Sequence, residues 1–240
     1  MKQRLDRLLV ERGLADSREK AQALIMAGEV SVDGQKASKP GHAIDTASAI
    51  EISGKPPYVS RGGVKLAGAL DAFGIDVSGC VCLDIGSSTG GFTDCLLQRG
   101  ASRVHAVDVG SGQLDWKLRN DPRVVVHEGI NARQLQYEEI GEHVDLATFD
   151  VSFISVTLIL PAAVPLLRSE GRIIILVKPQ FEVGKGHVGK GGIVRDPELH
   201  REACARVEDA VKSLGFETSM MDSPILGAEG NKEFLLYARH

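Results

Sequence analysis

The stretch Val81-Cys-Leu-Asp-Ile-Gly-Ser-Ser-Thr-Gly-Gly-Phe-Thr-Asp94 decides the fold. Apolar residues from Val81 to Ile85 predict a buried strand, and a helix is expected from about Gly91. The glycine-rich turn between them brings bare backbone close to a ligand at the carboxyl end of the strand. The next predicted strand, Val104 to Asp108, ends in a carboxylate that is placed to accept hydrogen bonds from ribose hydroxyls.

The spacing of the turn separates it from dinucleotide-binding proteins. It reads Asp84-x-Gly86-x-x-x-Gly90 instead of Gly-x-Gly-x-x-Gly. A ligand with a sugar but no pyrophosphate fits better, which favours S-adenosylmethionine as cofactor. The alternative is an ordinary strand-to-helix turn in an unrelated α/β protein. The expected cofactor contacts are Asp84, Gly86, Ser87, Ser88, Thr89, Gly90, Gly91, Phe92, Asp108 and Asn131.

These expected contacts have different roles. The glycines of the turn should follow the methionine and sugar side of the cofactor, and Asp108 should take the ribose hydroxyls. Asn131 either reads the adenine edge or caps a helix. Asp84 either orders the turn or meets the methionine ammonium group.

Composition indicates a cytoplasmic protein without a membrane segment. The chain has 240 residues, of which 43% are hydrophobic and 25% charged, and its formal net charge is -4. No apolar run reaches the ~18 residues of a membrane span, and the charged N-terminus does not resemble a signal peptide. The four cysteines have no metal-ligand spacing and suit free thiols in a reducing compartment, so no metal is expected.

Residues 1–54 are predicted to form a small α+β domain. Leucines at helical spacing predict a first helix, and Asp16 or Ser17 is placed to cap a second one. Residues 30–32 are predicted as a strand that runs into the tight turn Asp33-Gly34. Further short strands are expected around residues 44–52.

Basic side chains gather in these two predicted helices. The stretches Arg4–Val10, Ser17–Ile25 and Gly28–Gly34 resemble the RNA-binding domain of ribosomal protein S4, a module that also occurs in pseudouridine synthases and some tRNA synthetases. In that family the helix pair faces RNA, and the alternative is that the charges are only solvated. The resemblance implies RNA contact through Lys2, Arg4, Arg7, Arg18 and Lys20.

Residues 55–62 are expected to form a linker stiffened by Pro56-Pro57, and residues 63–240 a second domain. Strands and helices alternate along this domain, which predicts a doubly wound, mostly parallel, Rossmann-like α/β sheet. Strands are expected at 81–85, 103–108, 123–127, 144–149 and 172–178, with an antiparallel edge hairpin at 216–221 and 233–239. Helices are expected at 63–73, 91–99, 112–119, 155–168 and 197–214. Trp116 is expected in the core, and packing over the adenine pocket is the alternative.

Two charged residues end neighbouring strands of the predicted sheet. Asp150 closes one strand, and Lys178 follows five apolar residues of the next. An unpaired buried ammonium is costly, so a carboxylate partner is expected, and Asp150 is well placed. Spacing alone leaves open whether this pair is catalytic or structural.

Five motifs of the second domain resemble the FtsJ type of 2′-O-ribose RNA methyltransferase. They are Ser60–Leu66, Asp84–Thr93, Phe149–Phe153, Leu176–Glu182 and Asn231–Tyr237. With its N-terminal module, nearly the whole chain is similar to the TlyA family of ribosomal RNA methyltransferases, which are also labelled hemolysins. The resemblance implies ribosomal RNA or assembled ribosomal subunits as partner.

The FtsJ type uses a catalytic Lys-Asp-Lys-Glu set, which the resemblance puts on Lys65, Asp150, Lys178 and Glu233. A ribose hydroxyl is a poor nucleophile until its proton leaves or its developing charge is stabilised. Neutral Lys178 would accept the proton, whereas charged Lys178 would stabilise the alkoxide. The dipeptide Gly62-Gly63 departs from the alanine that the family often has before the first lysine.

Two other function classes remain as alternatives. A hemolysin would need a spanning or strongly amphipathic segment, and the sequence offers none. A non-catalytic RNA-binding factor of ribosome assembly would not need the Lys-Asp-Lys-Glu set. Residues 183–195 are expected to form a basic loop beside Lys178 that either folds over RNA or stays at the surface.

Overall fold

The computed structural model describes residues 2–37, 39–52, 57–189, 191–227 and 230–240. Contacts divide the chain into two compact units, with the boundary between Pro57 and Tyr58. Each unit has its own hydrophobic core.

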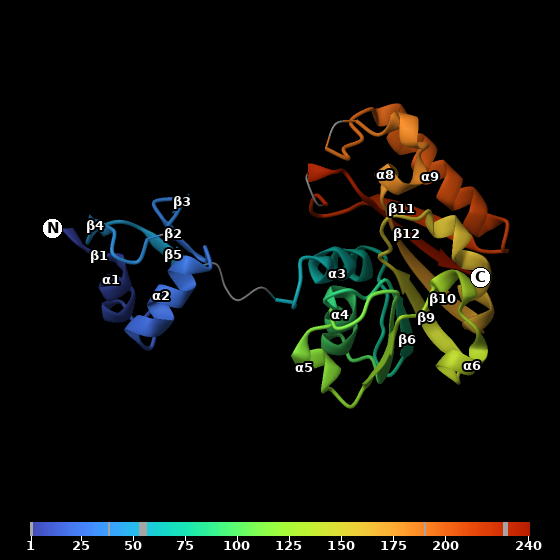
Figure 1. Cartoon of the computed structure of the whole chain (residues 1–240), viewed down its shortest axis with the longest axis horizontal. Coiled ribbons are helices and arrows are strands. Elements are labelled where there is room, and N and C mark those ends of the chain that lie inside the picture. The colour runs from blue at the N-terminus through green and yellow to red at the C-terminus, as the bar shows by residue number, and fades with distance from the viewer. Residues whose placement is uncertain (1, 38, 53–56, 190, 228–229) are drawn as a thin grey trace. The chain divides into compact units, whose positions relative to one another are not determined.

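The described residues of the first unit form two helices and two small sheets (Figure 1). Its elements are β1 (Lys2–Arg4), α1 (Leu5–Glu11), α2 (Arg18–Met26), β2 (Val30–Val32), β3 (Gln35–Lys36), β4 (Ala43–Asp45) and β5 (Ile50–Ile52). The Ser17 side chain caps α2 by accepting a hydrogen bond from the amide of Lys20. Positive φ angles at Asp33 and Gly34 turn β2 into β3, as a two-residue hairpin requires. Strand β1, which the sequence did not predict, pairs with β4.

The second unit is a seven-stranded sheet with the order β11-β12-β10-β9-β6-β7-β8. The strands are β6 (Val81–Ile85), β7 (Arg103–Asp108), β8 (Val124–Glu128), β9 (Val144–Phe149), β10 (Leu167–Val177), β11 (Glu217–Asp222) and β12 (Phe234–Arg239). The five strands from β10 to β8 are parallel, and β12 and β11 add an antiparallel hairpin. The predicted α/β architecture is therefore confirmed.

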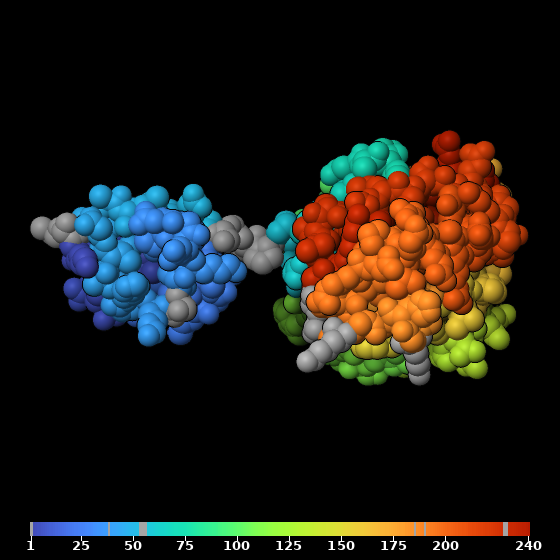
Figure 2. Space-filling model, turned by 90° about the horizontal axis from the view of Figure 1, so that it is seen from above, coloured from blue at the N-terminus to red at the C-terminus, as the bar shows by residue number. Residues whose placement is uncertain are grey.

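Helices cover both faces of this sheet (Figure 1). The longer ones are α3 (Gly62–Ala72), α4 (Gly91–Gln98) and α9 (Pro197–Lys212). Side chains of α3 and α4 join one core cluster, and those of α9 join the cluster on the other face. In the space-filling view, orange residues of α9 and of the segment before it lie beside red residues of the C-terminal part of the chain (Figure 2).

Two predicted helices differ in the structure. The segment 155–168 forms three short pieces, which are η2 (Val156–Leu158), α7 (Leu160–Ala163) and η3 (Val164–Leu166). Pro161 and Pro165 occupy first-turn positions of α7 and η3, where a missing amide proton is tolerated, so each starts a new piece. The expected helix 112–119 is the single turn α5 (Trp116–Arg119).

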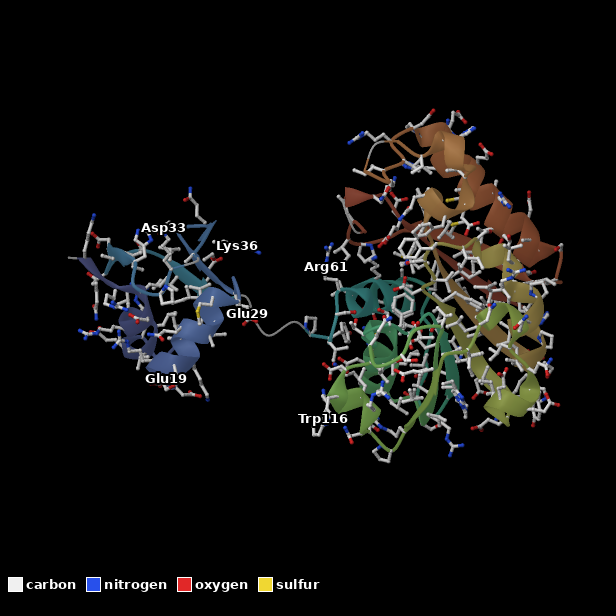
Figure 3. The ribbon with its side chains drawn as sticks, in the orientation of Figure 1. Glu19, Glu29, Asp33, Lys36, Arg61 and Trp116 are labelled. Atoms are coloured by element: carbon white, nitrogen blue, oxygen red, sulfur yellow. The ribbon has the colours of Figure 1, made fainter. Side chains whose placement is uncertain are left out.

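Trp116 was expected in the core, and that expectation is wrong. Its side chain is 78% exposed and points outward from the second unit (Figure 3). The apolar contacts of α5 come from Leu118, which is buried. Leu118, two residues further along α5, therefore faces the core in place of Trp116.

The remaining short elements are α6 (Tyr137–Ile140), α8 (Pro179–Glu182), η1 (Ala132–Gln134) and η4 (Lys185–His187). The sheet reverses its winding between β6 and β9, because the chain proceeds outward from β6 to β8 and then returns to β9 and β10. Ligands of such sheets bind at the carboxyl ends of the strands beside this switch point.

Candidate active site

A cavity of about 520 Å³ lies at the carboxyl ends of β6, β7 and β9. We call it the first cavity. Of the predicted cofactor residues, Gly86, Asp108 and Asn131 line it. Apolar walls come from Ile85, Val107, Val109, Ile130, Ile154 and Ile159.

Two glycines of the turn allow the backbone to pass close to its neighbours. Gly86 has φ +82°, and a Cβ atom there would stand 2.7 Å from the carbonyl oxygen of Asp150. Gly90 has φ +96°, and a Cβ atom there would overlap Leu118 and stand 2.8 Å from Leu114. Both positions therefore require glycine on conformational and steric grounds.

The Asp108 carboxylate is fixed at the wall of the first cavity. Its two oxygens accept hydrogen bonds of 2.8 Å from the amides of Ser88 and Gly110. A carboxylate has about four acceptor positions, so capacity remains for ribose hydroxyls. Asn131 also lines this cavity, and its side chain accepts a hydrogen bond of 3.1 Å from the amide of Arg133. Asn131 therefore both caps the short helix that follows it and lines the first cavity.

Asp84 lies beneath the turn and is fully buried. Its carboxyl group accepts hydrogen bonds from the hydroxyls of Thr93, at 2.6 Å, and Thr148, at 2.9 Å. Burial raises the pKa of Asp84 to about 7, although the two threonines oppose this shift. Of the two roles expected for Asp84, this geometry favours ordering of the turn.

The other predicted cofactor residues divide by exposure. Ser88 and Thr89 are exposed at the tip of the turn, where Ser88 has a positive φ angle. The buried ones, which support the turn and the start of α4, are Ser87, Gly90, Gly91 and Phe92.

A second cavity, of about 440 Å³, contains the whole Lys-Asp-Lys-Glu set. Lys65 comes from α3, Asp150 follows β9, Lys178 follows β10, and Glu233 precedes β12. The structure therefore brings together four residues that are spread over more than half of the sequence.

The four charges form two ion pairs. The Lys178 Nζ atom lies 2.6 Å from Asp150 Oδ1 and donates a second hydrogen bond of 2.8 Å to Ser152 Oγ. Lys65 pairs with Glu233, and these residues are only 8% and 3% exposed. Each buried ammonium thus has a carboxylate partner, as its desolvation requires.

Of the two glycines before Lys65, Gly63 has a steric cause, whereas a Cβ atom at Gly62 would make only ordinary contacts. A Cβ atom at Gly63 would overlap the Tyr58 ring, and one at Gly62 would stand 3.5 Å from Asp150 Oδ2. Alanine at position 63 would therefore displace Tyr58. The departure from the usual family pattern matches a closely packed start of α3.

Several lining residues of the second cavity were not predicted from the sequence as site residues. They include Ser152, Phe153, Gln180, Phe181 and Asn231. Phe153 is 92% exposed, has a φ angle of +67°, and lies 5.3 Å from the Phe181 ring between centroids. Its place as the last residue of the Phe149–Phe153 motif was the available signal, but exposure and backbone strain become visible only in the fold.

The two cavities share part of their walls. Asp150, Ser152 and Phe153 line both of them. Part of the loop expected beside Lys178 also reaches the second cavity, through Val188, Gly191 and Gly192. Lys190, in that loop, lies outside the described residues.

Two of the basic residues of the first unit, Arg4 and Arg18, bind a buried carboxylate. Asp6 is fully buried and accepts hydrogen bonds from Arg4, at 2.8 and 3.0 Å, and from Arg18, at 3.0 Å. Gln22 donates a further bond of 3.0 Å, and these donors, Arg4 above all, hold the pKa of Asp6 well below its usual range. The guanidinium side chains of Arg4 and Arg18 remain 44% exposed. Lys2, Arg7 and Lys20 are exposed, and Lys20 pairs with Asp16 at 2.6 Å.

Comparisons with known proteins give consistent matches over nearly the whole chain. The model of the FtsJ-like methyltransferase family matches residues 58–240, and that of the S4 domain matches residues 3–49. The chain is 51% identical to the 16S/23S rRNA (cytidine-2′-O)-methyltransferase TlyA of Mycobacterium tuberculosis, over 98% of this chain and 89% of that protein. It is 44% identical to hemolysin A of Brachyspira hyodysenteriae, over 98% of both chains.

Solved structures show the same relationship. A protein of Streptococcus thermophilus described as a hemolysin superposes with a TM-score of 0.77 at 43% identity, covering 99% of this chain and 88% of that one. An O-methyltransferase of Bacillus cereus in complex with SAH has a TM-score of 0.53 at 19% identity, covering 78% and 84%, which shows a shared fold. In the described part of the chain, no helix has both the length and the apolar character to cross a membrane.

Proposed function

Because the chain belongs to the FtsJ-like methyltransferase family, and within it to the TlyA proteins, we propose that it methylates the 2′-hydroxyl of a cytidine in ribosomal RNA. The observation that carries this proposal is the second cavity, in which Lys65, Asp150, Lys178 and Glu233 meet beside the first cavity. Substrate and cofactor would approach each other across the wall that the two cavities share.

The first cavity suits S-adenosylmethionine. Its volume lies within the range of small-ligand pockets, and its apolar walls suit an adenine ring. Asp108 would hold the ribose hydroxyls, Asn131 would contact the adenine, and Gly86 would let the ligand approach the backbone. When bound, this cofactor supplies a methyl group on a positively charged sulfur.

Lys178 is proposed as the central catalytic residue. Asp150 and Ser152 accept hydrogen bonds from two positions of its Nζ atom, which leaves the third position for the ribose oxygen. As an ammonium, Lys178 would stabilise negative charge developing on that oxygen; as a free amine, it would accept the proton. Asp150 would orient Lys178 in either form.

The Lys65 and Glu233 pair would hold the ribose in place. Both side chains are buried and form an ion pair with each other, so their positions are fixed before the substrate binds. Fixed polar groups keep a hydroxyl in line with its reaction partner, which contributes to the rate without proton transfer.

The central experiment measures transfer of labelled methyl groups from S-adenosylmethionine to unmodified ribosomal subunits. We expect label on ribose with the wild-type protein and a loss of at least about 100-fold in kcat with Lys178→Ala. Lys212→Ala is the matched control, because Lys212 lies on α9 and pairs with Glu208. An unchanged rate in Lys178→Ala would refute the catalytic set. No label on any subunit, despite bound cofactor, would favour the non-catalytic assembly factor.

The first unit is proposed to bind ribosomal RNA through Lys2, Arg4, Arg7, Arg18 and Lys20. Contacts to phosphates release counterions, so RNA affinity should fall steeply with salt. Arg7→Ala should weaken RNA binding and reduce the salt slope by about one unit, with cofactor affinity unchanged. Lys36→Ala is the control, since Lys36 is exposed on β3 (Figure 3). Equal effects of both variants would contradict this interface.

The hemolysin name of the Brachyspira relative favours one second function, membrane lysis. Purified protein mixed with erythrocytes in buffer of matched salt tests it directly, and intact cells would count against it. An enzyme that modifies ribosomal RNA acts where ribosomes are, so we propose a cytoplasmic location.

A further inference from the structure

One buried polar atom, on a residue that lines the second cavity, has no hydrogen-bond partner. It is the side-chain carbonyl oxygen of Gln180, Oε1, and across the described ranges no other buried side-chain nitrogen or oxygen shares this condition. Gln180 lies on α8, two residues after Lys178, and lines the cavity. Leaving a buried acceptor unpaired destabilises a protein, so each such atom in a folded chain calls for an explanation.

The unpaired oxygen of Gln180 is not needed to hold α8 in place, because Glu182 already does this. The Glu182 carboxylate accepts a hydrogen bond of 2.9 Å from the amide of Val156 and one of 2.5 Å from the hydroxyl of Ser155. These bonds tie α8 to the segment that follows Asp150. The side-chain amide of Gln180 is therefore available to bind a different partner.

The chemistry of RNA limits what that partner can be. Within an RNA chain, the 3′ and 5′ oxygens of a nucleotide are esterified and carry no proton. The 2′-hydroxyl is assigned to Lys178 by the proposed function, on which this step rests. A cytidine then has one remaining donor, the exocyclic amino group at N4.

We infer that Gln180 recognises the target base, with Oε1 accepting a hydrogen bond from the N4 amino group of cytidine. The side-chain amide offers an acceptor beside a donor, which matches the amino group and the N3 acceptor of cytosine. Uracil presents these two groups in the reverse order, so the amide would have to turn over.

The test is Gln180→Met, which keeps the volume of the side chain but removes both polar groups. Methyl transfer to unmodified ribosomal subunits should show KM raised about tenfold with a smaller change in kcat. On subunits assembled with uridine at the methylated position, wild type should show about tenfold lower kcat/KM than on cytidine, and Gln180→Met should lose this preference. Gln98→Met, at an exposed position at the end of α4, is the control.

Thermal unfolding separates recognition from structural support. Removing an unpaired buried acceptor should leave the Tm of the Gln180→Met variant unchanged or raise it by a few degrees. A fall in Tm together with an unchanged preference for cytidine would overturn the inference, as would wild-type KM in the variant. If the wild-type protein transfers no methyl group at all, the proposed function fails and takes this inference with it.

Discussion

Removal of Glu233 should destabilise the methyltransferase unit strongly, because it leaves Lys65 charged and buried. Both residues of the pair are almost inaccessible to water. Breaking a buried pair by removing one partner costs about 3–5 kcal/mol in unfolding free energy. A domain of this size loses about 3 °C of Tm per kcal/mol, so Glu233→Leu should lower Tm by roughly 10 °C.

A double variant tests the cause. Lys65→Met combined with Glu233→Leu removes both charges, so most of the lost unfolding free energy should return. Methyl transfer should stay low in the double variant, since the pair proposed to position the ribose is gone. Adding Lys65→Met to Glu233→Leu should thus restore stability but not activity. This difference separates the effect of a buried unpaired charge on stability from the effect of the pair on catalysis.

Calorimetry is the suitable assay, because a chain with two compact units can unfold in two transitions. Only the transition of the larger unit should move, and that of the first unit serves as internal control. If Glu233→Leu lowers the unfolding free energy by less than about 1 kcal/mol, the reasoning is refuted, because a loss that small is typical of a solvent-exposed ion pair. A double variant as unstable as the single one would refute it as well.

Three further outcomes are expected. Asp6→Asn should weaken RNA binding in a titration although it removes a negative charge, because Arg4 and Arg18 lose the carboxylate that holds both of them in place. Tighter RNA binding would show that net charge alone matters. Burial lowers the pKa values of His105 and His127, and the distance between His105 Nδ1 and His127 Nε2 is 3.0 Å. Below a pH of about 6.5, the unfolded chain therefore binds more protons at these two residues than the folded chain does. The unfolding free energy measured in urea should therefore fall as pH drops from about 7 to 5, and a flat profile would contradict the burial argument. Gly90→Ala should cost about 1–3 kcal/mol in urea unfolding and weaken cofactor binding by calorimetry, owing to the left-handed backbone and the Leu118 contact; wild-type values for both would remove the case for a strained turn.

Strand ends were predictable from the sequence, because apolar runs that stop at a charged residue mark the edge where parallel strands end. This pattern located Asp108, Asp150 and Lys178. The broken segment at 156–166 was not predicted, because its apolar spacing suits a continuous helix and outweighed the two prolines.

Properties that depend on tertiary neighbours could not be predicted. Whether Gln180 finds a hydrogen-bond partner depends on atoms from other elements. The exposure of Phe153 and of Trp116 depends likewise on which residues surround them in the fold. Sequence spacing carries no information on these relations, since it describes positions along the chain only.

The wall shared by the two cavities has a thermodynamic consequence. Asp150, Ser152 and Phe153 face both spaces, so an occupant of one space changes the surroundings of the other. If cofactor and RNA occupy them as proposed, any effect of one on the affinity of the other is reciprocal and equal in free energy. The demethylated cofactor would then retain modified RNA by the same factor by which RNA retains the demethylated cofactor.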